Sequence, residues 1–130
     1  MSDDIQRHQS NERLSRVVVH NGVVYVAGCT ATDRSGDAQA QTADILKKID
    51  GYLESVGTDK KRLLSVQIWL QDIDRDFAGL NAAWAEWVPK DAMPTRATCE
   101  AKLAAPDLRV EIIVTARSER HRSLRCRRWS

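Results

Sequence analysis

The sequence has few residues that could bind a metal ion or form disulfide bonds. Its three cysteines, Cys29, Cys99 and Cys126, lie far apart and include no C-x-x-C pair. The three histidines, His8, His20 and His121, lie toward the two ends of the chain and are not clustered. Structural zinc sites and disulfide frameworks place such residues at short, regular spacings. No serine or cysteine lies in a motif that would pair a nucleophile with its base. We therefore expect no metal, no disulfide framework and no catalytic triad.

Long apolar runs are also missing. No stretch approaches the roughly 20 residues that a membrane-spanning helix needs. The start of the chain, MSDDIQRHQSNERLS, is polar and acidic, unlike a signal or transit peptide. A chain of 130 residues can bury one core without disulfide bonds. We therefore expect a single cytoplasmic domain with no membrane contact.

Positive charge is concentrated near the C-terminus. The net charge of +2 conceals six arginines and one glutamate in residues 117–130, RSERHRSLRCRRWS, which leaves −3 on the rest of the chain. Terminal charge runs are usually solvated, although they can hold phosphates. We expect a polar segment over residues 1–13, a domain over 14–116 and a basic tail over 117–130. The charge of the body argues against a nucleic-acid partner.

The first half of the chain predicts a β-hairpin and a helix. Residues 16–20 and 23–27 are rich in valine, and the dipeptide NG between them suits a type I′ turn. Apolar residues then recur at every third or fourth position over 37–56, which is typical of an amphipathic helix. Gly57 is a natural end for that helix.

The rest of the chain predicts three strands, a second helix and an α+β fold. We expect strands over 63–70, 95–103 and 108–115, and a helix over 76–88 with Phe77, Leu80, Trp84 and Trp87 on one stripe. The strand over 95–103 alternates small apolar residues with Arg96, Thr98 and Glu100. The order ββαβαββ predicts a mixed sheet with both helices on one face.

The second face of this sheet also carries apolar residues. Several strands have them at adjacent positions, as in Val17-Val18-Val19 and Ile112-Ile113, so neither face is purely polar. A sheet face that no helix covers must meet solvent or another subunit. We therefore expect a homo-oligomer.

The order of these segments resembles the RidA/YjgF family of reactive-intermediate deaminases, most closely its YoaB-like branch. The resemblance runs from about Leu14 to Ala116. Its carriers are NGVVYVAG, QTADILKKIDGYLESVG, SVQIWLQD, DFAGLNAAW, PTRATCE and RVEIIVTA. The family implies a chorismate-mutase-like fold, a homotrimer with a pocket between subunits, and hydrolysis of 2-imino acids to 2-keto acids and ammonia without a cofactor.

The resemblance also implies roles for individual residues. Arg96 of the P-x-R motif would grip the substrate carboxylate, and Glu111 of the V-E-I motif would activate or position water. Asn81 and Gly28 match pocket residues, and Thr98 matches a position that contributes a backbone carbonyl. Two pocket residues of the family are missing, because its Ser-Gly-Gln is Ala27-Gly28-Cys29 here and its Gly-Pro-Tyr segment has no match around Leu14-Ser15-Arg16.

The chemistry of imine hydrolysis suits these residue types. An arginine presents a planar fork that a carboxylate meets with two charge-assisted hydrogen bonds, an orientation that lysine fixes less well. A carboxyl group can then serve the attacking water as general acid and base.

Structural roles are the alternatives. Arg96 could be a surface residue paired with Glu100 on an adjoining strand of the assembly. Glu111 could pair with Lys102 across a last hairpin, and Asn81 could cap or bridge backbone groups beside its helix. Cys29 and Cys99 are expected to be packing residues. For the whole protein, the alternative is a non-catalytic trimer that binds a small carboxylate or a partner, and a weaker one gives the arginine tail an RNA-binding role.

Overall fold

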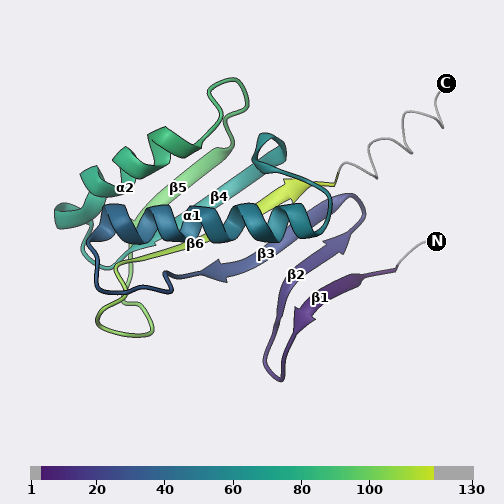
Figure 1. Ribbon diagram of the computed structural model, residues 1–130, viewed down its shortest axis with the longest axis horizontal. Helices are drawn as coiled ribbons and strands as arrows, with labels where there is room; N and C mark the ends of the chain where they lie inside the picture. Colours follow the sequence, from purple (N-terminus) through teal and green to yellow (C-terminus); the bar gives the residue numbers. More distant parts are fainter. Residues whose placement is uncertain (1–3, 119–130) are drawn as a thin grey trace.

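A six-stranded mixed sheet carries two helices on one of its faces (Figure 1). The computed structural model describes residues 4–118. The elements in chain order are β1 (Gln6–Ser10), β2 (Ser15–His20), β3 (Val23–Cys29), α1 (Ala38–Ser55), a 3₁₀ turn (Lys60–Arg62), β4 (Leu63–Leu70), α2 (Ile73–Trp87), β5 (Thr95–Glu100) and β6 (Val110–Arg117). The strands lie in the order β1-β2-β3-β6-β4-β5. The predicted α+β fold is confirmed.

The β2–β3 hairpin has the predicted turn. Asn21 and Gly22 have φ angles of 50° and 81°, which a type I′ turn requires at both central positions. Val17 of β2 lies opposite Val26 of β3 in the antiparallel register. The turn chemistry therefore determines which valines face the core.

Helix α1 begins and ends at residues that cap its free backbone groups. The Asp37 side chain accepts a hydrogen bond from Ala40 N at 2.9 Å, which makes Asp37 the N-cap. At the other end Gly57 has φ 80°, and Thr58 N donates to Leu53 O at 3.1 Å. This is a Schellman motif, so Gly57 ends the helix as the sequence predicted.

The polar N-terminal segment contains a strand that the sequence analysis did not predict. β1 pairs with β2 in antiparallel register, with Gln6 opposite Val19 and Ser10 opposite Ser15. Its side chains are mostly exposed and polar, as suits a strand at the sheet edge. It was missed because no apolar alternation marks it. At the other end, β6 runs through Arg117; the predicted basic tail from residue 119 onward lies outside the described residues.

The last two strands do not form a hairpin, contrary to our expectation. β5 pairs in parallel with β4, whereas β6 lies between β3 and β4 and is antiparallel to both. The parallel β4–β5 pair is joined by α2, the kind of connection that parallel strands require. β6 is therefore central and β5 is an edge strand.

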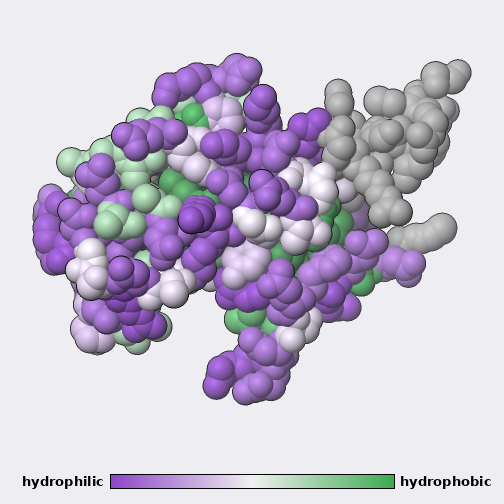
Figure 2. All heavy atoms as spheres, viewed as in Figure 1, coloured by the Kyte–Doolittle hydropathy of each residue, from purple (hydrophilic) through white to green (hydrophobic). Residues whose placement is uncertain are grey.

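The core lies between the sheet and the two helices. Val24, Val26, Ile68, Ile112 and their neighbours of the same strand parity are buried beneath α1 and α2. From the helix side, hydrophilic residues cover most of the surface and apolar residues show between them (Figure 2). Within the described residues, no helix is long and apolar enough to cross a membrane.

Helix α2 buries a different stripe from the predicted one. Leu80 and Trp84 are buried as expected, but Phe77 is 43% exposed. The buried residue in the first turn is Asp76, whose carboxylate accepts two hydrogen bonds from Arg75 at 2.9 and 2.7 Å. Arg109 Nη1 lies 3.7 Å from the same carboxylate. Asp76 can be buried because these arginines satisfy it, and Phe77 is then turned outward.

We call the side of the sheet away from the helices the open face. Its side chains come from β3, β4, β5 and β6: Tyr25, Ser65, Gln67, Trp69, Thr95, Ala97, Cys99, Glu111, Ile113 and Thr115. Tyr25 and Ile113 are 46% and 37% exposed. The small alternating residues of β5, Thr95, Ala97 and Cys99, therefore lie on this face and not in the core.

Buried Gln41 connects the loops at one end of the sheet, and we predict that its loss is destabilising. Its Nε2 donates to the carbonyls of Arg34, Gly36 and Asp107 at 3.2, 3.2 and 3.0 Å, and its Oε1 accepts from Arg109 N at 2.9 Å. Gln41→Leu leaves these backbone groups unpaired, so the free energy of unfolding should fall by about 2–4 kcal/mol. Urea denaturation measures this. The exposed Gln39→Leu on the same turn is the control; equal losses in the two variants would contradict the role of Gln41.

Candidate functional site

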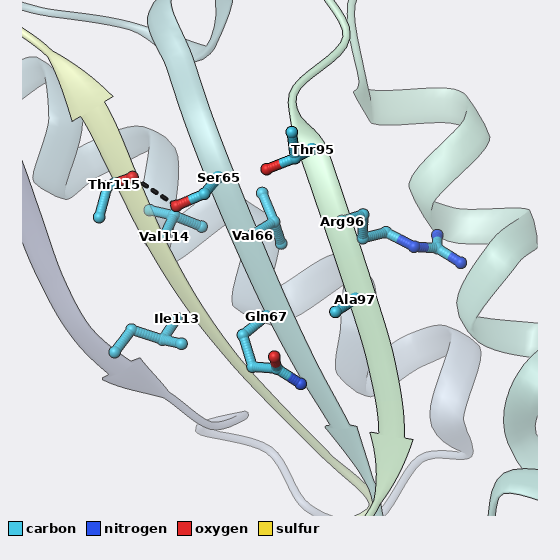
Figure 3. Close-up of a pocket in the computed structure, with 9 residues that line it drawn as sticks. All are labelled: Ser65, Val66, Gln67, Thr95, Arg96, Ala97, Ile113, Val114 and Thr115. Atoms are coloured by element: carbon cyan, nitrogen blue, oxygen red, sulfur yellow. Dashed lines mark hydrogen bonds between the residues drawn. The ribbon is translucent and has the colours of Figure 1, made fainter.

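The guanidinium of Arg96 lies against an aromatic ring on the helix side of the sheet. Arg96 of β5 is in register with buried Val66 of β4, so both side chains lie on the helix face. Its Cζ lies 5.4 Å from the ring centroid of Trp84 in α2. Figure 3 shows the side chain pointing toward α2. Partial burial lowers the pKa of Arg96, yet an arginine stays charged at neutral pH.

Arg96 has no acidic partner among residues 4–118. The nearby alternative, Glu100, uses its Oε1 to accept a hydrogen bond from Ile73 N at 3.1 Å, at the start of α2. The structure gives the Arg96 guanidinium neither a hydrogen bond nor an ion pair within the described chain. The alternative, a pair with Glu100 on an adjoining strand of the assembly, stays a prediction. The in-plane N–H groups of Arg96 are available to a ligand.

Thr98 and Asn81 lie on the same side of the sheet as Arg96. Thr98 is in register with buried Ile68, and its Oγ1 is buried without a hydrogen-bond partner in residues 4–118. Asn81 precedes Trp84 by three residues on α2, so the two lie on neighbouring parts of one helix surface. The Asn81 side chain caps no backbone group in the described structure. Three of the five candidate residues thus face the helix side, around β5 and α2.

Glu111 and Gly28 form a second group, on the open face. Glu111 of β6 lies opposite Trp69 of β4 in the register, with the opposite parity to the core residues. A Cβ atom built on Gly28 would overlap the Glu111 carboxylate and lie 3.3 Å from its Cδ. Glycine is therefore needed here so that the carboxylate can lie against the backbone of β3. The suggested partner, Lys102, makes no ion pair with Glu111 in the part of the chain that the structure describes.

Arg16 holds the backbone next to this second group. Its Nη2 donates to Gly28 O at 3.1 Å, and its Cζ lies 5.3 Å from the ring centroid of Tyr52 in α1. The register of β3 against β6 is irregular between Val26 and Cys29, so the hydrogen bond falls at a bulge. Sequence reasoning identified Arg16 only as part of a segment without a pocket tyrosine. The signal that could have found it is the register of the hairpin, in which Val17 lies opposite Val26 and the preceding Arg16 therefore comes close to Gly28.

Cys29, the last residue of β3, is buried. Burial raises the pKa of the Cys29 thiol, and the nearby charges of Arg16 and Lys48 only partly oppose that effect. Its Sγ lies 3.5 Å from Arg16 Nη2. A protonated, buried thiol is a packing residue, as expected from the sequence.

The sheet itself separates Arg96 from Glu111. Successive side chains of a strand point to opposite faces, and the register places Arg96 with the core residues and Glu111 with the open face. The structure brings Arg96, Thr98 and Asn81 to one side, and Gly28 and Glu111 to the other. One chain therefore cannot direct both the guanidinium and the carboxylate at the same ligand.

A shallow hollow of about 360 Å³ lies on the open face. Its walls are side chains of β4, β5 and β6, among them Gln67, Ile113 and a Ser65–Thr115 hydroxyl pair whose oxygens are 2.6 Å apart (Figure 3). Arg96 borders it, but its guanidinium points away from it. The hollow therefore does not contain the candidate anion-binding group. Among residues 4–118, no three His, Cys, Asp or Glu side chains are grouped so that they could hold a metal ion.

Comparison with solved structures identifies the class of fold. An uncharacterized protein from Pseudomonas aeruginosa has a TM-score of 0.86 at 44% identity, covering 89% of this chain and 100% of that one. A member of the YjgF protein family from Neisseria meningitidis has a TM-score of 0.87 at 38% identity, covering 90% and 97%. The mixed sheet with two helices on one face is thus a YjgF-type α+β domain.

The sequence comparisons define the family. The profile of the family described as Endoribonuclease L-PSP matches residues 4–118. A RutC family protein from Haemophilus ducreyi is 43% identical over 86% of this chain and 95% of its own length. The RutC family protein YoaB of Escherichia coli is 39% identical over 86% and 96%. The chain belongs to this family, known as RidA/YjgF or RutC, and the resemblance seen in the sequence is confirmed.

The close contact between Gly28 and Glu111 leads to a prediction. Gly28→Ala forces the Glu111 carboxylate away from β3, which should lower the free energy of unfolding by about 1–3 kcal/mol. Removing the carboxylate should relieve the overlap, so Gly28→Ala should cost much less in a Glu111→Ala background. Urea denaturation of the two single variants and the double variant measures this coupling. Additive effects would contradict the contact.

Proposed function

We propose that the protein is an enamine/imine deaminase that hydrolyses 2-imino acids to 2-keto acids and ammonia. The observation that carries the proposal is the Arg96 guanidinium, held on Trp84 with its N–H edge free of protein acceptors in residues 4–118. A planar carboxylate meets such an edge with two parallel hydrogen bonds. Family membership supports the reaction class, and the cytoplasm is the compartment in which we place it.

The proposed reaction needs only side chains and water. Arg96 binds the carboxylate and thereby fixes the position of the neighbouring C=N carbon. Glu111 accepts a proton from a water molecule whose oxygen bonds to that carbon. The imine reacts in its protonated form, so this step gives a neutral carbinolamine. Glu111 then returns its proton to the amino nitrogen and takes up the hydroxyl proton as the C=O bond forms and the C–N bond breaks. The departing ammonia receives that proton from Glu111 and leaves as ammonium. The rate enhancement comes from two effects: the enzyme holds the imine and the water together, and Glu111 acts as general acid and base.

The site in this proposal lies between subunits. Arg96 and Glu111 face opposite sides of the sheet, so a ligand can contact both only where the helix side of one chain meets the open face of another. Such a contact joins two different surfaces, and repeated contacts of this kind form a ring when the rotation between subunits closes. A homotrimer, which the family resemblance implies, fits this requirement. The exposed Tyr25 and Ile113 then become interface residues.

A non-catalytic carboxylate-binding trimer is the second candidate function. It is favoured by Ala27, which lacks the hydroxyl of the family serine, and by Leu14, which stands in the segment without the pocket tyrosine and is 43% exposed. Both candidates use Arg96 to bind a carboxylate. They differ in one respect: only the deaminase accelerates the decay of a 2-imino acid.

Mixing two inactive variants tests the intersubunit site. Arg96→Ala and Glu111→Gln should each lower kcat/KM by about 10²- to 10⁴-fold, since one loses charge-assisted bonds and the other general acid–base help. When they are unfolded together and refolded, about one quarter of the pockets should combine an intact Arg96 with an intact Glu111. The decay of a 2-imino acid, generated in situ by an amino-acid oxidase, measures the recovered activity.

The control for the mixing experiment is each variant refolded alone, which should stay inactive. Sedimentation must show that both variants assemble as the wild type does. Activity that does not rise on mixing would contradict a site shared between chains. Imine decay that the wild type does not accelerate, together with saturable binding of a keto acid, would favour the non-catalytic candidate.

A charge on the open face should prevent assembly. Ile113→Lys places an ammonium group in the proposed interface, where it would be desolvated without a partner. The dissociation constant of the assembly should therefore rise at least tenfold. Light scattering coupled to gel filtration measures the mass against concentration. The matched control is Glu54→Lys, at an exposed position of α1. If Ile113→Lys assembles as well as the control, the open face is not the interface.

A further inference from the structure

Within residues 4–118, the Arg96 guanidinium has one side-chain partner, the ring of Trp84. The indole is 8% exposed and belongs to the core between α2 and the sheet. The Arg96 side chain itself is partly exposed at the edge strand β5. A buried ring thus lies against a partly exposed cation.

The Trp84 ring is in turn fixed by its neighbours. Its centroid lies 5.7 Å from that of Trp87, with the two ring planes tilted by 48°. Trp87 Nε1 donates to Asp50 Oδ2 of α1 at 3.0 Å. Lys60 Nζ lies 5.2 Å from the Trp87 centroid and donates to Trp87 O at 2.7 Å. Contacts from α1 and the 3₁₀ turn therefore support the ring on which Arg96 rests.

Two arginines with an acidic partner show what an aromatic support changes. Arg75 donates two hydrogen bonds to Asp76, and Arg109 Nη1 lies 3.7 Å from the same carboxylate. A carboxylate would hold Arg96 equally well, but it would occupy the N–H edge and neutralise the charge. The face of an indole attracts the guanidinium and leaves the edge free.

We propose that Trp84 is a positioning residue: it holds the plane of the Arg96 guanidinium so that a 2-imino or 2-keto acid binds through both carboxylate oxygens. This inference rests on the function proposed above, in which Arg96 is the carboxylate clamp. Trp84 acts through Arg96 and touches no reacting atom. Its loss should therefore weaken ligand binding and leave the chemical step almost unchanged.

Substitution of the ring tests this role. Trp84→Leu should raise the Kd for pyruvate, measured by calorimetry, and the KM for the imine by about 3- to 30-fold, as expected from loss of a cation–π contact. kcat should change less than about twofold. Trp84→Phe keeps an aromatic face and should recover most of the affinity. Ile49→Val, which thins the core without contact to Arg96, is the control for destabilisation and should leave both constants unchanged.

Incorporation of fluorinated tryptophan into the wild-type protein provides a second test, which does not require that Trp84→Leu folds. Fluorine withdraws electron density from the ring face and nearly conserves the shape of the ring. In the wild-type protein, log Kd for pyruvate should therefore rise with the number of fluorine atoms on each tryptophan ring. Trp84→Phe, in which Trp69, Trp87 and Trp129 are still labelled, should show no such dependence.

Each outcome has one reading. A Kd that follows fluorination in the wild type but not in Trp84→Phe supports the inference. If the wild type binds pyruvate and neither fluorination nor Trp84→Leu changes the Kd, the role of Trp84 is wrong while the proposed function stands. If kcat falls with KM unchanged, Trp84 does not act through carboxylate binding. If the wild type neither binds pyruvate nor hydrolyses imines, the proposed function fails as well.

Discussion

The alternation of side chains along a β-strand is the constraint on which the site depends. Because β5 and β6 both pair with β4, the registers determine that Arg96 lies with the core residues and Glu111 with the open face. No rotamer of either side chain changes the face from which it starts. In the proposed function, the two groups therefore act on one molecule across a contact between chains, and the uncovered sheet face is the surface that we propose for this contact.

Among residues 4–118, three arginines donate to protein groups that belong to the fold. Arg75 and Arg109 satisfy buried Asp76, and Arg16, which also lies over Tyr52, donates to Gly28 O at the strand bulge. Arg96 instead rests on an indole and donates to no group in the described part of the chain. A charge that is partly desolvated without an acceptor costs stability unless something binds it. This difference is the physical reason to regard Arg96 as a binding residue and the others as structural.

Much of the fold was predictable because local chemistry specifies it. The Asn21-Gly22 turn, the Schellman end at Gly57 and the valine-rich strands all follow from short-range rules. Strand β1 was not predictable, because a polar edge strand has no alternation and is formed only by pairing with β2. The order β6-β4-β5 depends on long-range pairing, which is why the expected last hairpin was wrong. The residues of the site were recognised from motifs, but their separation onto two faces required the register.

The most direct measurement is a crystal structure of the assembled protein with pyruvate bound. Our account predicts that both carboxylate oxygens lie against the N–H edge of Arg96, with Trp84 behind the guanidinium and Glu111 of a neighbouring subunit close to the keto carbon. It would be contradicted if pyruvate bound away from Arg96, or if the subunits associated so that Arg96 and Glu111 of adjacent chains were too far apart to contact one small molecule.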